Sequence, residues 1–235
     1  MGRIFEKRKY KMFARYARMS KAFNRMGREI AVAVKSGGGD PAYNMRLRMA
    51  IQTAKSLNMP KDRIDAAIKR AISKDTENYQ EIVYEGYGPH GVAMMIECAT
   101  DNPTRTVANI RSILNKNGGT LGASGSVAFM FERKGVFRLA TGTMDLDALE
   151  LDLIDYGADE IERGEGEVIV YTTFENFAGM QKALEEKSIN IVSAELQRLP
   201  ASITELDDVA ADEIGQLVER LDEDDDVQAV FHNMR

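Results

Sequence analysis

Residues 81–99 of this 235-residue chain read EIVYEGYGPHGVAMMIECA, and this stretch decides the class of the fold. Two β-rich runs, Glu81 to Tyr87 and Val92 to Ala99, flank the turn Gly88-Pro89-His90-Gly91. Runs of β-branched and aromatic residues on either side of a Gly/Pro turn are typical of a β-hairpin. We therefore expect an antiparallel sheet to begin here.

The same stretch contains the pattern GxGxxG between Gly86 and Gly91. A dinucleotide-binding site places this pattern between a strand and a helix, with backbone amides directed at the pyrophosphate. Here a second strand follows the glycines, and Pro89 has no N–H to donate. We interpret the pattern as the hairpin turn and expect no cofactor site.

Helix and strand signals alternate after the hairpin. The expected helices are Thr104–Asn117, Leu146–Tyr156, Phe174–Glu186 and Ile203–Leu221, and the expected strands are Val127–Phe131, Val136–Leu139, Glu167–Thr172, Ile189–Arg198 and Val227–Phe231. Pro200 marks a boundary, after which the last helix and strand have no partner unit of their own. The simplest arrangement returns them to the sheet of residues 79–140, with residues 141–199 as an insertion.

Residues 1–75 are predicted to be helical. One apolar stripe has the 3–4-residue spacing of a single long helix and consists of Met12, Tyr16, Met19, Phe23, Met26 and Ile30. Gly37–Gly39 ends that helix, and Asp40 with Pro41 is expected to cap the next one. A third helix opens at Pro60 with Ile64, Ile68 and Ile72 inward, which completes a small bundle.

The predicted class is therefore α+β, with an N-terminal helical bundle and two ferredoxin-like α/β sandwich domains, the third inserted into the second. The expected boundaries are residues 1–77 for the basic helical domain, 78–140 and 200–235 for the discontinuous α/β domain, and 141–199 for the inserted α/β domain.

Charge is divided unevenly along the chain. Residues 1–75 hold 19 Lys and Arg against 6 Asp and Glu, whereas residues 76–235 hold 12 against 31, which gives the formal net charge of −6. A basic module joined to an acidic body is typical of a protein that binds a polyanion at one end. The alternative is that both surfaces are merely solvated.

Twelve basic residues of the helical module are the candidate nucleic-acid contacts. They are Lys7, Arg8, Lys9, Lys11, Arg15, Arg18, Lys21, Arg25, Arg28, Arg46, Arg48 and Lys55. Lys and Arg on phosphates position a protein without reading sequence, and no set of Asn, Gln and Arg directed at a groove is evident. Tyr10, Phe13 and Tyr16 interleave with these charges and could stack on unpaired bases, although core packing is the alternative for Tyr16.

Several other classes of protein do not fit the sequence. The single cysteine, Cys98, forms no internal disulfide and fits a reducing compartment, and two histidines are too few for most His-based sites. The longest notable apolar run, Val92 to Ile96, is shorter than the ~18 residues of a membrane span, and the charged start differs from a signal peptide. We expect a cytoplasmic protein with no catalytic, cofactor or metal site and no membrane partner.

Two loops have features of ligand-binding sites, one for calcium and one for phosphate, but we expect neither to bind its ligand. The acidic run with Asp222, Asp224 and Asp226 imitates the start of a calcium loop, but Val227 stands where Gly is required, so we expect a solvated turn. Residues 122–126 are expected to form a flexible, amide-rich loop, with a backbone contact to a ligand phosphate as the alternative.

Several motifs, in order along almost the whole chain, resemble the YebC family. They are Arg28-Glu29-Ile30, Gly37-Gly38-Gly39-Asp40-Pro41, Asn58-Met59-Pro60-Lys61-Asp62, Tyr84-Glu85-Gly86-Tyr87-Gly88-Pro89, Thr100-Asp101-Asn102, Lys116-Asn117-Gly118-Gly119, Gly125-Ser126-Val127-Ala128-Phe129-Met130-Phe131, Asp226-Val227-Gln228 and His232-Asn233. The resemblance implies three domains, the third inserted into the second. The start departs from the family, since the short Gly-His-Ser-Lys-Trp opening is replaced by Arg3-Ile4-Phe5-Glu6-Lys7 and the chain has no Trp.

The resemblance also implies a function. Members of the YebC family are described as probable transcriptional regulators that bind DNA, mitochondrial relatives are translational activators, and bacterial relatives have been viewed as ribosome-associated factors that assist peptide-bond formation at difficult sequences. No catalytic triad, metal or organic cofactor is associated with the family. We expect a non-enzymatic regulator that binds nucleic acid, either DNA or ribosomal RNA, with the ribosome as a possible partner. An acidic protein-interaction adaptor that uses residues 141–199 is a further alternative.

Overall fold

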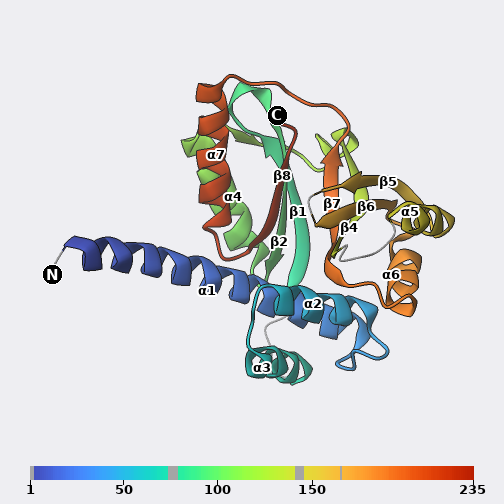
Figure 1. Ribbon diagram of the computed structural model, residues 1–235. Coiled ribbons are helices and arrows are strands. Elements are labelled where there is room, and N and C mark those ends of the chain that lie inside the picture. The colour runs from blue at the N-terminus through green and yellow to red at the C-terminus, as the bar shows by residue number, and fades with distance from the viewer. Residues whose placement is uncertain (1–2, 74–78, 141–145, 165) are drawn as a thin grey trace. The chain divides into compact units, whose positions relative to one another are not determined.

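The computed structural model describes residues 3–73, 79–140, 146–164 and 166–235, and it describes side chains from residue 19 onward, except that of Leu146 (Figure 1). These residues divide into two compact units, Met1–Tyr79 and Gln80–Arg235. The mixed α+β class expected from the sequence is confirmed, with a helical first unit and two antiparallel sheets in the second.

The first unit contains three helices, α1 (Arg3–Gly37), α2 (Met45–Ser56) and α3 (Lys61–Ile72). Ile30 of α1, Leu47 of α2 and Ile64 of α3 are buried in one apolar cluster, and Phe23 packs at its margin. The predicted spacing of apolar residues therefore forms the core in the second half of α1. Ile72 differs from the prediction, because it is 61% exposed and the preceding Ala71 is buried in its place.

The expected cap at Asp40 is wrong, because α2 begins five residues later with Asn44 as its N-cap. The Asn44 side chain accepts a 3.0 Å hydrogen bond from the Leu47 N–H and donates 2.7 Å bonds to the carbonyls of Ala33 and Gly38. This one buried amide therefore provides hydrogen-bond partners for a backbone N–H at the start of α2 and for backbone carbonyls at the end of α1. The exposed Asp40 closes a tight turn instead.

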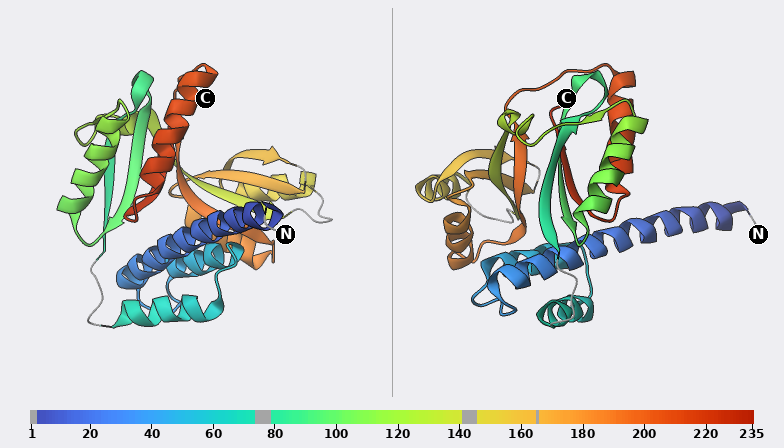
Figure 2. Two further views of the ribbon diagram at one scale, coloured as in Figure 1. Left: turned by 90° about the vertical axis from the view of Figure 1, so that its left-hand side faces the viewer. Right: turned by 180° about the vertical axis from the view of Figure 1, so that it is seen from behind.

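The second unit begins with the sheet that the hairpin predicts. Its strands are β1 (Gln80–Tyr87), β2 (Ala93–Thr100), β3 (Thr120–Leu121) and β8 (Val227–His232), in the antiparallel order β3-β1-β2-β8. Helices α4 (Pro103–Lys116) and α7 (Asp208–Asp222) cover one face, where Ile96, Ile110 and Leu217 are fully buried (Figure 2). The C-terminal helix and strand do return to this sheet.

The second sheet has the ferredoxin-like order. Its elements are β4 (Phe131–Ala140), α5 (Leu146–Asp155), β5 (Ala158–Arg163), β6 (Glu167–Thr173), α6 (Phe177–Glu186) and β7 (Ile191–Pro200). The strands lie in the antiparallel order β5-β6-β4-β7, so the segment from β4 to β7 forms a βαββαβ sandwich. The rings of Phe137 on β4 and Phe177 on α6 lie 4.7 Å apart and join helix to sheet.

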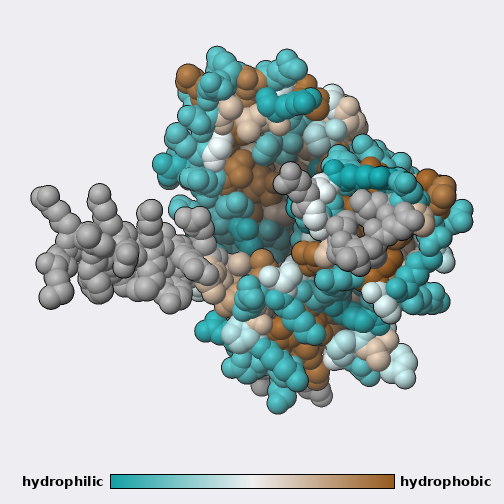
Figure 3. All heavy atoms as spheres, viewed as in Figure 1, coloured by the Kyte–Doolittle hydropathy of each residue, from teal (hydrophilic) through white to brown (hydrophobic). Residues whose placement is uncertain are grey.

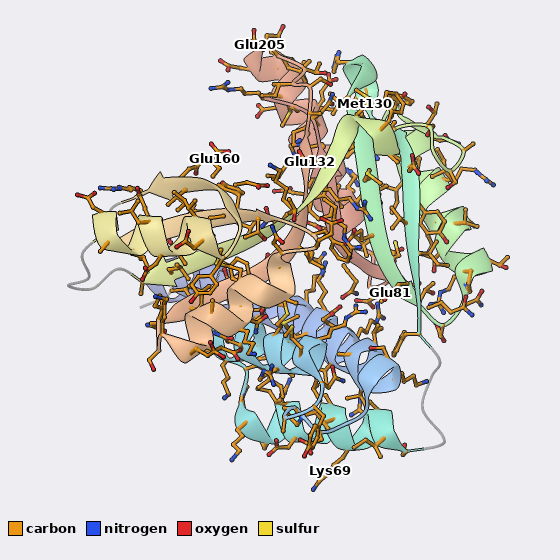
Figure 4. All side chains as sticks on the ribbon, turned by 90° about the vertical axis from the view of Figure 1, so that its right-hand side faces the viewer. Lys69, Glu81, Met130, Glu132, Glu160 and Glu205 are labelled. Atoms are coloured by element: carbon orange, nitrogen blue, oxygen red, sulfur yellow. The ribbon has the colours of Figure 1, made fainter. Side chains whose placement is uncertain are left out.

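Strand pairing corrects the assignment of two predicted strands. Residues 136–139 were expected in the first sheet, but they belong to β4, which lies between β6 and β7 in the second. The expected strand Val127–Phe131 is instead a short 3₁₀ turn, Ala128–Met130, before β4. Figure 4 shows Met130 and Glu132 where the chain passes from one sheet to the other. By strand pairing, the second sheet therefore includes residues 131–140.

Candidate nucleic-acid interface

A basic stripe runs along α1. The helix is continuous over Arg3–Gly37, so residues three, four or seven apart share a face. Such spacings connect Lys7, Lys11, Arg18, Lys21, Arg25, Arg28 and Lys35. At 1.5 Å per residue the stripe is about 42 Å long. Lys35, which is exposed in the last turn, extends the predicted set and was missed by the sequence analysis, although the seven-residue spacing from Arg28 indicates it.

Six of the predicted contacts have described side chains, and three of them stabilise the bundle. Arg46 Nε lies 2.9 Å from Glu29 Oε1. The Arg28 guanidinium lies 5.5 Å from the centre of the Tyr79 ring. Arg48 Nη1 donates 3.0 and 3.3 Å hydrogen bonds to the carbonyls of Pro41 and Ala42. These cations have local structural contacts whether or not a polyanion is bound.

The remaining predicted contacts separate into two groups. Lys21 and Arg25 are partly buried on α1, and Lys55 is exposed in the last turn of α2. The side chains of Lys7, Arg8, Lys9, Lys11, Arg15 and Arg18 lie outside the described residues, although all six positions fall on α1. The structure thus places the twelve on two helices, with α1 as the larger group.

Helix α3 adds basic residues that the sequence analysis did not select. Lys61, Arg63, Lys69 and Arg70 are all exposed there. The Arg63 guanidinium lies 5.8 Å from the centre of the Phe23 ring, which joins α3 to α1 through a cation–π contact. Hydrophilic side chains are prominent over α3 in the space-filling view (Figure 3).

Tyr43 is an exposed aromatic residue in a well-braced turn. Its relative exposure is 89%. The backbone N–H groups of Tyr43 and Asn44 donate to the Asp40 carbonyl at 3.2 and 3.0 Å, and the Ala42 N–H donates to Asp40 Oδ1 at 2.9 Å. Arg48 holds the same turn from α2. The turn therefore presents an exposed aromatic ring on the basic unit, and such a ring is suited to stacking on unpaired bases.

The amide-rich loop of the second unit holds a carboxylate of its own chain. Buried Glu85 accepts hydrogen bonds from the N–H groups of Gly125, Val127 and Ala128, at 2.7, 2.8 and 2.9 Å. Burial acts to raise the pKa of Glu85, but the three N–H donors outweigh it and lower the pKa below its ordinary value. These donors are occupied, which removes the alternative that the loop binds a ligand phosphate through them.

The acidic run near the C-terminus is partly buried. Asp226 accepts hydrogen bonds from the Thr106 hydroxyl at 2.7 Å, from the Thr100 hydroxyl at 3.2 Å and from Arg105 Nη2 at 2.9 Å. Its side chain is 4% exposed, so the expectation of a fully solvated turn is wrong at this residue. The sequence did not show that Thr100, Arg105 and Thr106 would meet it.

The described part of the chain offers neither a cluster of metal ligands nor a membrane-spanning helix. It contains no group of three or more His, Cys, Asp or Glu side chains arranged to hold a metal ion. Within it, no helix combines the length and apolar character needed to cross a membrane.

Two family models together match almost the whole chain. The family model described as the TACO1/YebC protein N-terminal domain matches residues 3–74, and the model described as the TACO1/YebC second and third domain matches residues 79–234. The chain belongs to the TACO1/YebC family. The resemblance found in the sequence motifs is thereby confirmed.

Curated TACO1/YebC relatives match over their full length. A protein of Cytophaga hutchinsonii is 53% identical over 234 residues, which cover 100% of this chain and 98% of the relative. A protein of Porphyromonas gingivalis is 50% identical over 236 residues, with 100% and 98% covered. Both carry the name "Probable transcriptional regulatory protein". At the level of the family, these names describe regulators.

A solved structure supports the TACO1/YebC fold. The crystal structure of a conserved hypothetical protein from Aquifex aeolicus matches with a TM-score of 0.81 and 38% identity. The match covers 92% of this chain and 90% of the Aquifex chain.

Proposed function

We propose that this chain is a non-enzymatic regulator of gene expression that binds nucleic acid through its helical unit, as a transcriptional regulator on DNA. The observation that carries the proposal is the basic stripe of α1, in a unit where cations outnumber carboxylates by 19 to 6 over residues 1–75. A rod of positive charge on one helix is suited to follow a phosphate backbone. The regulatory names of the relatives support the same reading.

The proposed contacts are the twelve predicted residues on α1 and α2, together with Lys35 and the exposed cations of α3. Arg28, Arg46 and Arg48 also stabilise the bundle, so changes there alter folding and binding together. Changes at Lys21 and Lys55 report more directly on binding.

A second candidate is a ribosome-associated translation factor that contacts ribosomal RNA. The observation that favours it is Tyr43, which is 89% exposed on a turn whose Pro41 carbonyl accepts a hydrogen bond from Arg48. Aromatic faces stack on splayed bases of single-stranded loops, whereas a regular DNA duplex keeps its bases stacked inside. An effect of Tyr43 on RNA binding and not on duplex binding favours this candidate.

Charge reversal tests the proposal. The full chain and a variant with Arg15→Glu, Arg18→Glu and Arg25→Glu are titrated with duplex DNA and with a hairpin RNA at several salt concentrations. We expect the variant to lose binding to both and the parent to show a steep salt dependence. Equal affinity and equal salt slope for the two proteins would reject the helical unit as the binding site.

A further inference from the structure

Helix α5 is apolar on two opposite faces. Leu149 and Leu153, four residues apart, are 7% and 0% exposed and pack inward. Leu151 and Ile154, three residues apart, are 69% and 58% exposed. A surface helix of a globular protein normally carries one apolar stripe, and a second stripe facing water is typical of a docking surface.

Three ion pairs connect α5 to neighbouring elements. Arg163 on β5 contacts Asp147 Oδ1 through Nη2 and Glu150 Oε1 through Nε, both at 2.6 Å. Lys187, at the end of α6, forms an ion pair with Asp152. These surface pairs connect α5 to β5 and to α6, while burial of Leu149 and Leu153 fixes which face of the helix presents the ridge formed by Leu151 and Ile154.

The net charge of residues 141–199 indicates the charge expected of a partner. Residues 141–199 contain 14 Asp and Glu against 4 Lys and Arg. All four cations of this segment, Arg163, Lys182, Lys187 and Arg198, are already engaged in ion pairs. The excess of carboxylates gives this domain a negative potential, which attracts a basic partner and repels nucleic acid. Figure 3 shows hydrophobic patches among hydrophilic ones at the α5 end of the unit.

We propose that the Leu151–Ile154 ridge of α5 docks a basic amphipathic helix of a partner protein. The partner would place an apolar stripe against Leu151 and Ile154, while its Lys and Arg side chains are attracted by the net negative charge of residues 141–199. A ten-residue helix offers a small contact area, so the complex is of the weak, transient kind and weakens with added salt. The ridge is apolar and lies in an acidic segment, whereas the helical unit is basic. The test of the ridge does not depend on nucleic-acid binding.

The test uses a labelled model peptide. An 18-residue helix of Leu and Lys, with Leu at i, i+3, i+4 and i+7 spacing, is titrated against the full chain and followed by fluorescence anisotropy. A second peptide of the same composition has its Leu residues spaced so that they share no helical face. We expect the helical peptide to bind at least about tenfold more tightly than the scrambled one.

Two protein variants locate the site. Leu151→Gln combined with Ile154→Gln should weaken binding of the helical peptide about tenfold. The matched control is Val209→Gln, which removes an apolar residue that is 71% exposed on the acidic helix α7 and should leave binding unchanged. An unchanged circular dichroism spectrum and an unchanged unfolding temperature show that each variant is folded.

The proposal is overturned if the double variant binds the helical peptide as the parent does, or if both peptides bind equally, since charge alone then explains the affinity. It is also overturned if sedimentation of the parent shows self-association that the double variant abolishes, because the occupant is then a second copy of this chain.

Discussion

Arg46 on α2 and Glu29 on α1 are joined by an Nε–Oε1 contact of 2.9 Å. A cation expected to face a polyanion therefore ties two helices of the bundle together. Both side chains are about one-third exposed, at 37% and 30%. The pair thus combines a structural role with a place on the proposed binding surface, and the two roles can be separated by mutation.

Arg46→Gln should lower stability slightly, by about 0.5–1 kcal/mol, because a partly exposed ion pair contributes little. Lys55→Gln, also on α2, should leave the unfolding free energy within about 0.5 kcal/mol of the parent. Urea unfolding of the two variants makes the comparison. Equal stability of all three proteins would show that the Arg46–Glu29 pair does not stabilise the bundle.

Lys21→Gln with Lys55→Gln should reduce the salt dependence of nucleic-acid binding. Each lost phosphate contact lowers the slope of log Kobs against log salt by about 0.9 for duplex DNA and about 0.7 for single strands. The control is Lys182→Gln in the acidic domain, where the lysine is 73% exposed and paired with Glu186. A slope that changes equally in both proteins would assign the effect to net charge instead of these sites.

Tyr43→Ala should weaken binding to single-stranded RNA by about 1–3 kcal/mol, which is the contribution of one stacked base. Tyr43→Phe should retain the affinity because the ring is preserved. The 89% exposure of Tyr43 means that neither change should alter the unfolding temperature by more than about 2 °C. RNA affinity that is the same for Tyr43→Ala and the parent would remove Tyr43 from the interface.

Glu85→Gln should destabilise the second unit by about 1–3 kcal/mol, because it sets an amide NH₂ group against the N–H donors of the 125–128 loop. The more exposed Glu132→Gln is the matched control, since its side chain is 62% exposed. Thermal unfolding at neutral pH compares the two. Similar losses for both variants would contradict the account of the loop.

The same residue gives a prediction for pH. The native pKa of Glu85 lies below its ordinary value, so the unfolded chain binds the proton more readily. Its stabilising contribution is therefore fully present above the unfolded pKa of about 4.3 and is lost as pH falls through the lower native value. Unfolding free energies measured from pH 6 to pH 3 should fall less steeply for Glu85→Gln than for the parent.

Local patterns predicted much of the fold. The spacing of Phe23, Met26 and Ile30 identified the helix face that forms the bundle core, and the Gly/Pro turn identified the β1–β2 hairpin. Strand pairing was harder to predict, because β4 could have joined either sheet and its neighbours along the chain do not show which. The strand β5 was missed because its solvent-exposed side chains are mostly charged and give little apolar signal.

The basic surface of the helical unit was predicted in composition, but the contacts of its side chains were not. Clustered Lys and Arg indicated a basic helical unit, and helical spacing placed many of them on one face of α1. The sequence could not show that Arg46 meets Glu29 or that Asn44, and not Asp40, caps α2. Arg46 and Glu29 are 17 residues apart in sequence, and the Asn44 side chain is held by the Ala33 carbonyl 11 residues before it, so neither arrangement follows from the local pattern.

Sedimentation of a cell lysate through a sucrose gradient tests the central claim most directly, with DNase, RNase and high salt applied in parallel. Nucleic-acid binding predicts that the protein migrates with heavy material and is released by high salt and by one of the two nucleases. Release by DNase supports the transcriptional role, and release by RNase from ribosomal particles supports the translational one. Migration at the position of the free protein in every gradient would contradict the account.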